Sequence, residues 1–306
     1  MRILDAKQAE TKLAEIGYYR LSGYWYPARE FLIGVDGDHL TCPVSKKPLR
    51  GDNFSPVTFF TDAVELYRFD KELRLLMLDA VESLEVNLRT LIAHELGACD
   101  PMAYKDVSYI NPKQTKDFTK DGKLRNTWKE WSARQQQQLD RCKEDCIVWH
   151  RKSSRSIPFW VAVEAWDFGT VSKYFEMLKG SYQNKVLSRV GLTDARMFTR
   201  WLQEVNLLRN RCAHHTRIWN QVSANPLNVP VSDPYFSGLS LSSVALTRLY
   251  GLIAIIWYLL RPTAADHSWI DKVSRLIDCM PSLPGCNYAG IGLQDPAGFP
   301  RHLFDR

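Results

Sequence analysis

The chain has 306 residues, of which 45% are hydrophobic and 24% are charged, and its formal net charge is +6 at pH 7. These proportions exclude intrinsic disorder, because a chain with this much apolar surface can offset the entropy of ordering. The most apolar run, residues 252–260, is far shorter than the roughly 20 residues that span a bilayer, so we expect no membrane association. P-loops, dinucleotide-binding glycine motifs and nucleophile elbows are absent from the sequence.

The N-terminus and the cysteines indicate a cytoplasmic protein. Charged side chains interrupt the first twelve residues, so the apolar core of a secretory signal cannot form there. The seven cysteines are odd in number and scattered along the chain, which without an export signal is typical of reduced thiols.

The first part of the chain, residues 16–55, predicts an aromatic collar and a loop. A short helix over residues 5–16 precedes it and ends at Gly17. Residues 18–31 are rich in Tyr and Trp and are interrupted by Gly and Pro, so we expect them to pack as a collar. Such an aromatic run can stack RNA bases, although clusters of this kind more often belong to a core. Residues 32–55 predict an exposed loop or hairpin.

The strongest helix is expected over residues 58–96, within a block that covers 56–97. Leu and Met side chains recur there at helical spacing and form one apolar stripe. The opposite face carries Glu82, Glu85 and Arg89, of which the last two have the favourable i,i+4 spacing of an ion pair.

Residues 105–155 form a basic insertion. They hold 13 Lys and Arg against 7 Asp and Glu, whereas the rest of the chain holds 27 of each, so this segment carries the whole net charge. It also contains Trp128, Trp131 and Trp149. The combination suits a polyanionic partner, and a solvent-exposed surface segment without a partner explains it equally well.

Residues 158–280 predict a helical bundle. One helix opens at Pro158, because Pro is tolerated in a first turn, and we expect its Trp160 and Trp166 to be buried. The further helices are expected at 195–213, 241–261 and 268–280.

The Gly- and Pro-rich tail at 281–306 is expected to be irregular. Strand signals are weak throughout. The whole chain, 1–306, is therefore predicted to be one all-α domain, a helical bundle with loop insertions.

Residues that carry chemistry concentrate at the end of the predicted helix 195–213, where the sequence at 209–215 is RNRCAHH. Cleavage of an RNA phosphodiester requires a base for the 2′-hydroxyl proton, an acid for the departing 5′-oxygen and a fixed cation for the charge on phosphorus. Histidine can serve as base or acid near neutral pH, and the planar fork of arginine matches phosphate oxygens. The stretch therefore favours an RNA-cleaving site with Arg209 and His214.

The spacing of Arg209 and His214 adds a geometric constraint. Five positions of an ideal helix rotate a side chain by about 140° and advance it by about 7.5 Å, so both cannot face one phosphate from a straight helix. Either the helix ends or bends near Ala213, or a second subunit completes the site. A single His must also act as both acid and base unless His215 or a second copy of His214 helps. Both arguments favour a two-fold homodimer.

The stretch 209–214 matches the R-N-x-x-x-H form of the R-x(4–6)-H signature of HEPN-superfamily ribonucleases. Four blocks in order also resemble the Abi-like abortive-infection proteins of the AbiD/AbiF group, and the resemblance spans residues 16–260. The blocks are IGYYRLSGYWYPAR at 16–29, YRFDKELRLLMLDAVESLEVNLRT at 67–90, PFWVAVEAWDFGTVSKYF at 158–175 and LRNRCAHHTRIWN at 208–220. The chain departs from these relatives in two places. They carry further residues before its first helix, so its N-terminus is expected to be shortened, and its tail at 292–300 matches poorly.

The resemblance implies an α-helical HEPN fold, a homodimer and endonucleolytic RNA cleavage that needs neither a metal nor another cofactor. It implies a role in bacterial phage defence by abortive infection, or as the toxin of a toxin–antitoxin pair. It further implies restraint by a cognate small RNA, which fits the basic insertion. The substrate is expected to be single-stranded or looped RNA, because unstacked nucleotides can reach the geometry of in-line attack.

Carried over to this sequence, the family motif gives catalytic roles to Arg209 and His214 and an orienting role to Asn210. The candidates for a supporting role are His215, Arg211, Glu82, Glu85 and Arg89. The candidates for contacts with RNA are Arg20, Arg29, Lys129, Arg134, Arg151, Lys152, Arg155 and Arg217.

Other interpretations stay open. The chain is alternatively a catalytically silent HEPN dimer that binds RNA or a partner, or a purely structural helical protein. The R-x4-H spacing also occurs at Arg89 and His94, where the Asn and the flanking blocks are missing. There we interpret Arg89 as solvated or salt-bridged and His94 as structural.

A metal site is a weaker candidate. Cys142, Cys146 and His150 fall at i, i+4 and i+8 of an expected helix. Zinc takes four ligands and usually closer cysteines, so chance explains this spacing better.

Overall fold

The computed structural model describes residues 1–223, 226–263, 267–294 and 298–305. Helices dominate this part of the chain, so the prediction of an all-α protein is confirmed. The α-helices are α1 (Ala6–Ile16), α2 (Tyr18–Trp25), α3 (Phe60–Gly97), α4 (Thr127–Arg141), α5 (Asp145–Lys152), α6 (Phe159–Ala162), α7 (Phe168–Met177), α8 (Gly180–Arg189), α9 (Ala195–Ala213), α10 (Pro234–Leu239), α11 (Leu249–Leu260) and α12 (Ser268–Asp278). The short 3-10 helices are η1 (Tyr26–Ala28), η2 (Ala103–Lys105), η3 (Val107–Tyr109), η4 (Pro112–Thr115), η5 (Val163–Ala165), η6 (Ala245–Thr247), η7 (Tyr288–Gly290) and η8 (Arg301–Asp305).

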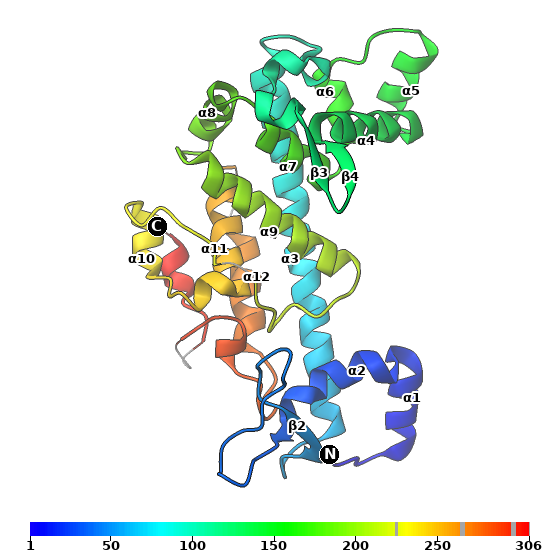
Figure 1. The fold of residues 1–306 in the computed structure, drawn as a ribbon. Helices are drawn as coiled ribbons and strands as arrows, with labels where there is room; N and C mark the ends of the chain where they lie inside the picture. Colours follow the sequence, from blue (N-terminus) through cyan, green and yellow to red (C-terminus); the bar gives the residue numbers. More distant parts are fainter. Residues whose placement is uncertain (224–225, 264–266, 295–297, 306) are drawn as a thin grey trace.

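The 38-residue helix α3 runs along the length of the molecule and contacts α2, α6, α8, α9, α11 and α12 (Figure 1). Its apolar stripe is buried against these helices, as Leu73, Met77 and Leu84 illustrate. At its start, the Asp62 carboxylate accepts the backbone N–H of Phe59. The predicted helix at 58–96 is confirmed.

Helix α11 is apolar on every side, and all of its residues are buried. It packs between α3, α9 and the last described part of the chain, which removes the need for a polar face. No helix among the described residues is both long enough and apolar enough to cross a membrane.

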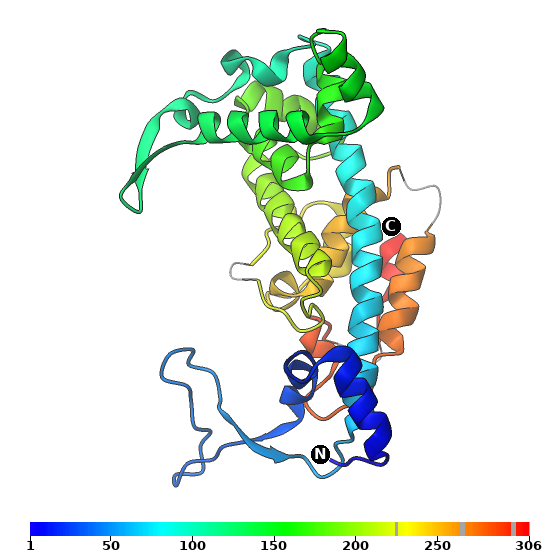
Figure 2. The ribbon, with the colours of Figure 1, turned by 90° about the vertical axis from the view of Figure 1, so that its right-hand side faces the viewer.

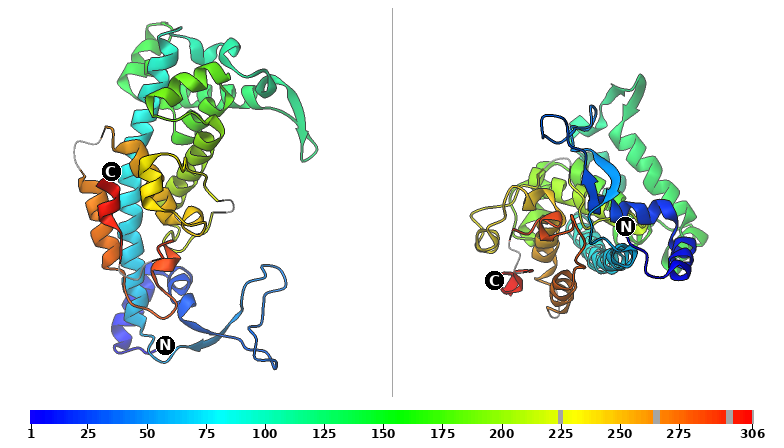
Figure 3. Two further views of the ribbon diagram at one scale, coloured as in Figure 1. Left: turned by 90° about the vertical axis from the view of Figure 1, so that its left-hand side faces the viewer. Right: turned by 90° about the horizontal axis from the view of Figure 1, so that it is seen from below.

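Two antiparallel hairpins extend from the body. β1 (Arg29–Phe31) pairs with β2 (Arg50–Phe54), so the segment 32–55 closes a long hairpin rather than a simple loop. β3 (Asp117–Lys120) pairs with β4 (Lys123–Asn126) inside the basic insertion. Both hairpins project from the same side of the molecule, and α12 lies on the other side of α3 (Figures 2 and 3).

The aromatic collar is more regular than its Gly and Pro residues indicated. Gly17 ends α1 as predicted, with a φ of 90°, and the chain continues directly into α2. Tyr24 and Trp25 are buried, whereas Tyr19 is 90% exposed. Only part of the collar therefore belongs to the core.

The helix predicted to open at Pro158 is shorter than expected. It breaks at Trp166, whose backbone is extended, and Asp167 then caps the separate helix α7. Trp166 is fully buried as predicted, but the prediction for Trp160 was wrong, because this side chain is 54% exposed. Similarly, the helix predicted at 241–261 begins only at Leu249 as an α-helix.

The expected helix through Cys142, Cys146 and His150 was also wrong. Helix α4 ends at Arg141 and Cys142 has extended backbone, so the three residues do not share one helix face. Of the tail predicted to be irregular, residues 295–297 and 306 lie outside the described residues. Its described part contains only short 3-10 helices.

Candidate functional site

Helix α9 carries the Arg-Asn-x-x-x-His motif. The Asp194 side chain caps its first turn. The inner face of α9 carries the buried side chains of Trp201, Val205 and Leu208 and contacts α3, α7 and α11. The motif therefore lies at the C-terminal end of a helix whose rotation is set by packing.

The helix ends at Ala213, which is the first of the two geometric alternatives considered above. The N–H of His215 donates to the carbonyl of Cys212, and the N–H of Thr216 donates to the carbonyl of Arg211 over 2.8 Å. This is a Schellman motif, in which the left-handed residue is usually glycine. Here His215 occupies that position with a φ of 57°.

A buried carboxylate holds the loop that follows the motif. Asp70 of α3 accepts the backbone N–H groups of Ile218 and Trp219, over 3.0 and 2.8 Å. It also accepts the Tyr24 hydroxyl over 2.7 Å and is ion-paired with Arg74. The Asp70 side chain is fully buried, so the loop is tied to both α2 and α3.

The sequence interpretation missed this buried pair. Asp70 and Arg74 have i,i+4 spacing on the apolar stripe of the strongest predicted helix, and charged residues on such a stripe are almost always paired. Their position on the apolar stripe could therefore have predicted a buried ion pair.

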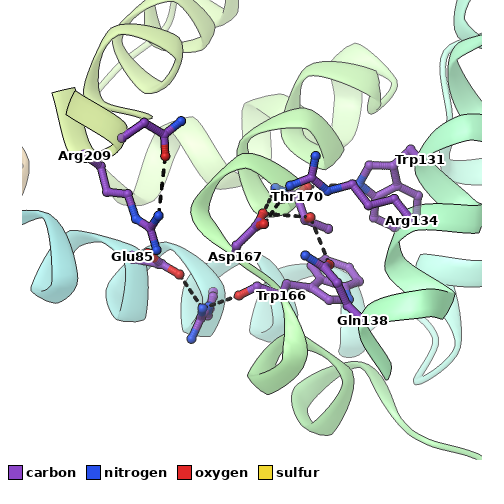
Figure 4. A network of polar contacts seen from close by, with 10 residues as sticks. Glu85, Trp131, Arg134, Gln138, Trp166, Asp167, Thr170 and Arg209 are labelled. Carbon is purple, nitrogen blue, oxygen red and sulfur yellow. Dashed lines mark hydrogen bonds and ion pairs between the residues drawn. The ribbon is translucent and has the colours of Figure 1, made fainter. Parts of the chain in front are cut away.

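The arginine of the motif lies in a small pocket beside α3. Arg209 is half-buried, and its guanidinium is directed toward Glu85 (Figure 4), with a 3.4 Å hydrogen bond to the Asn210 side chain. Glu85 is ion-paired with Arg89, which also donates to the carbonyl of Trp166. We call this cavity of about 360 Å³ the Arg209 pocket.

Burial and neighbouring charges shift the pKa of Glu85 in the Arg209 pocket in opposite directions. Burial raises the pKa of Glu85, and the guanidinium groups of Arg89 and Arg209 oppose this shift. The exposed Glu82 lines the same pocket. Three of the four charged residues at this place were proposed as a supporting group from the sequence, and the structure brings them together around Arg209.

A second charged pair lies next to this group, on α4 and α7 (Figure 4). Arg134 donates to the Asp167 carboxylate over 2.6 Å, and Asp167 also accepts the backbone N–H of Thr170. Burial disfavours the ionised carboxylate, but the Thr170 N–H and Arg134 outweigh it, so the pKa of Asp167 is lowered. The sequence interpretation missed Asp167, although Asp three residues before Thr170 at a helix start is a capping signal.

The motif histidine is exposed at the end of α9. Its imidazole makes no hydrogen bond with any other described residue, and no hydrogen bond or ion pair of the described chain joins His214 to Arg209. Ala213 and His215 line a second cavity, of about 540 Å³, which we call the His215 pocket. It adjoins the Arg209 pocket, since Leu78 lines both.

Two of the candidate RNA contacts hold the motif loop. Arg217 donates to the carbonyl of Gly23, and Arg20 donates to the carbonyl of His215 over 3.3 Å. Arg211, between Arg209 and the turn, is half-buried.

The remaining candidates are spread over both ends of the molecule. Arg29 is ion-paired with Asp52 at the first hairpin. At the other end, Lys129 lies 3.6 Å from Asp117, and Lys152 is exposed. The others join local structure, because Arg151 donates to two carbonyls between α4 and α5 and Arg155 lies over the Trp149 ring.

The second R-x4-H pair of the sequence, Arg89 and His94, is divided between the group around Arg209 and the surface. The His94 ring is on the surface, with 66% of its side chain exposed, whereas Arg89 is salt-bridged as expected. Within the described ranges, no group of three or more His, Cys, Asp or Glu side chains is arranged to hold a metal ion.

Comparison with known proteins agrees with the four sequence blocks. The family model described as Abi-like protein matches residues 11–220, more than half of the chain, so the chain belongs to the Abi-like protein family. This match includes α2, α3, α9 and the whole motif. No curated protein and no solved structure matches the chain.

Proposed function

We propose that the chain is a metal-independent HEPN endoribonuclease that acts in the bacterial cytoplasm, in abortive-infection defence or as the toxin of a toxin–antitoxin pair. The observation that carries the proposal is the exposed imidazole of His214, which follows the half-buried Arg209 in the R-N-x-x-x-H motif of an Abi-like chain. An imidazole with no partner among the described residues is available to a substrate.

The proposed reaction needs only these groups and the RNA. His214 accepts the proton of the 2′-hydroxyl, the 2′-oxygen bonds to phosphorus, and the bond from phosphorus to the 5′-oxygen breaks. An imidazolium returns a proton to the departing oxygen, so the products are a 2′,3′-cyclic phosphate and a 5′-hydroxyl. Arg209, oriented by Asn210, holds the negative charge on phosphorus during the attack.

The placement of the two motif residues supports a homodimer. Arg209 faces the pocket beside α3, whereas His214 lies beyond the end of α9. A two-fold related copy can bring a second His214 to the same phosphate and supply the acid as well as the base. The dimer is part of the proposal.

The test compares His214→Ala with His94→Ala, since both histidines follow an arginine by five positions. Cleavage of labelled RNA in EDTA should fall about 100- to 10,000-fold in His214→Ala, the usual contribution of a general acid or base. His94→Ala should cut as wild type. Both melting temperatures should match wild type, because both rings are on the surface. Full activity of purified His214→Ala would reject the nuclease.

A second candidate function is a silent module that binds RNA, including a cognate small RNA, without cutting it. The observation that favours it is the exposed β3–β4 hairpin, where Lys120 and Lys123 flank the turn of the basic insertion. The same RNA incubation separates the two functions. A salt-dependent mobility shift with intact RNA supports the module, and cut RNA supports the enzyme.

A further inference from the structure

The lining of the His215 pocket contains three basic side chains, Arg20, Lys71 and Arg74, and the ring of Tyr67. Its volume of about 540 Å³ lies within the range of small-ligand sites. Ala213 and His215, at the end of α9, form one wall, and α1, α2 and α3 form the others. It therefore lies directly at the end of the proposed catalytic helix.

Cations predominate in this lining. Arg20 and Lys71 are exposed side chains at the pocket, and Lys71 makes no hydrogen bond or ion pair with any described residue. The one carboxylate of the lining, Glu15, is already ion-paired with Lys12. Arg74 is neutralised by Asp70. Glu15 also attracts Lys71, but the lining keeps a positive charge at Arg20 and Lys71, which suits an anion.

The lining also offers an aromatic ring. Tyr67 of α3 is partly buried and packs edge-on against Tyr24, with ring centroids 5.4 Å apart. Its position is fixed by this contact. An aromatic surface beside two cations is the combination that binds single-stranded nucleic acids, in which each unit has a phosphate and a base.

The backbone of the pocket wall is held in an unfavourable conformation. His215 has a left-handed φ of 57°, and the Arg20 side chain donates to its carbonyl. Glycine at this position of the turn would remove the cost of a side chain. The cation that faces the pocket thus also fixes the strained residue of the motif.

The pockets form a continuous path. Tyr67, Lys71, Leu78, Glu82 and Glu85 follow one another at helical spacing along α3 and line the two cavities in turn. A strand that lies along this face reaches Arg209 at one end and Lys71 at the other.

We propose that the His215 pocket holds one nucleotide of the RNA next to the scissile phosphate, with its phosphate bound by Arg20 and Lys71 and its base against Tyr67. The position next to the scissile phosphate rests on the proposed nuclease function, whereas the binding of the nucleotide in the pocket does not depend on cleavage.

The experiment measures binding with an RNA that cannot be cut. The probe is a fluorescein-labelled single-stranded RNA in which every 2′-hydroxyl is methylated, so the attacking group is absent. Fluorescence anisotropy over a salt series gives the Kd and its salt dependence for wild type, Lys71→Ala and Arg20→Ala/Lys71→Ala. We expect the double variant to raise the Kd at least 10-fold, and each lost phosphate contact to lower the slope of log K against log salt by about 0.7.

The matched control is Lys272→Ala, which removes one exposed lysine from a cavity formed by α3 and α12. It should leave the Kd of the probe unchanged. Lys71→Ala keeps the test valid even where the loss of Arg20 disturbs the turn, because Lys71 holds no other described residue.

Each outcome decides the proposal. An unchanged Kd in both pocket variants, a loss in Lys272→Ala as large as in Lys71→Ala, or no binding of the probe by wild type overturns it. Cleavage of unmodified RNA is read separately. A wild-type chain that binds through Lys71 but cuts nothing rejects the nuclease and retains the pocket. A chain that cuts normally after Lys71→Ala, with an unchanged KM, retains the nuclease and rejects the pocket.

Discussion

Asp70 and Trp219 are joined by a 2.8 Å hydrogen bond between a fully buried carboxylate and a backbone N–H, although 149 residues separate them in the chain. This contact joins two of the four sequence blocks, 67–90 and 208–220, which are far apart in the chain. One block supplies the carboxylate on α3, and the other supplies the loop that follows the motif on α9. The motif is thus positioned from both sides, by the packing of α9 before it and by Asp70 after it.

Replacing Asp70 by Asn should destabilise the protein strongly. The change leaves Arg74 buried without its counter-charge, and breaking a buried pair in this way costs about 3 to 5 kcal/mol. Urea unfolding measures the change in the free energy of unfolding. In the folded variant, hydrogen–deuterium exchange should be faster at the amides of Ile218 and Trp219, which lose their acceptor charge.

The control for this variant is Glu65→Gln, which removes an ion pair with Arg68 on the same helix. Both of its side chains are about half-exposed, so the expected loss is below about 0.5 kcal/mol. Equal losses at Asp70 and Glu65 would contradict a buried role for Asp70.

Asp167→Asn should lower stability at neutral pH and have a smaller effect in acid. The pKa of Asp167 is lowered in the folded protein, so its charge contributes stability above its ordinary pKa of 3.8. That contribution is lost as the pH falls through the lowered value. Because the side chain is 39% exposed, we expect only about 0.5 to 1 kcal/mol at pH 7.

This pH dependence isolates the charge, because Asn keeps the oxygen that caps the Thr170 N–H. Unfolding of both proteins in urea at pH 7 and at pH 3 measures it. Asp140→Asn serves as the control, since Asp140 forms no ion pair with any described residue and the change should cost less than about 0.5 kcal/mol. If Asp167→Asn loses as much stability at pH 3 as at pH 7, the loss comes from a weaker helix cap and not from the missing charge.

The helices could be predicted from the sequence because periodicity, Gly17 and the Leu stripe are local signals. The predictions failed where a tertiary contact decided the structure. Trp160 has a large apolar side chain of the kind that is usually buried in a core. It lies, however, on the outer face of the short helix α6 and is half-exposed. The break before α7 was missed because the Asp167 cap outweighed the apolar run around it.

The candidate site was predictable to the level of the motif and not beyond. The spacing of Arg209 and His214 left two alternatives open, a helix that ends or bends near Ala213 or a second subunit, and the helix does end at Ala213. Glu82, Glu85 and Arg89 were proposed to support the site because they match a polar helix face of the family, and the structure places them around Arg209. The His215 pocket was not foreseen, because it is assembled from α2, α3 and the turn, and no sequence spacing reports that meeting.

Arg209→Lys should abolish most of the cleavage while the fold survives. Lysine keeps the positive charge beside Glu85 but replaces a planar fork of donors with a point charge, and the loss of one such transition-state donor costs about 100-fold or more. Initial rates on labelled RNA measure the effect, which should appear in kcat. Arg196→Lys, in the exposed first turn of the same helix, should be fully active. Wild-type rates for Arg209→Lys would remove the arginine from the chemistry.

Gly285→Ala should be far more costly than Gly122→Ala, although both glycines have a left-handed φ, of 77° and 72°. A Cβ at Gly122 meets open space, so only the backbone strain of about 1 kcal/mol applies. A Cβ at Gly285 would lie 2.1 Å from the carbonyl oxygen of Pro27, so steric repulsion should add about 1 to 3 kcal/mol. Urea unfolding of the two variants measures the difference. Equal losses would contradict the close contact between Gly285 and Pro27 of the aromatic collar.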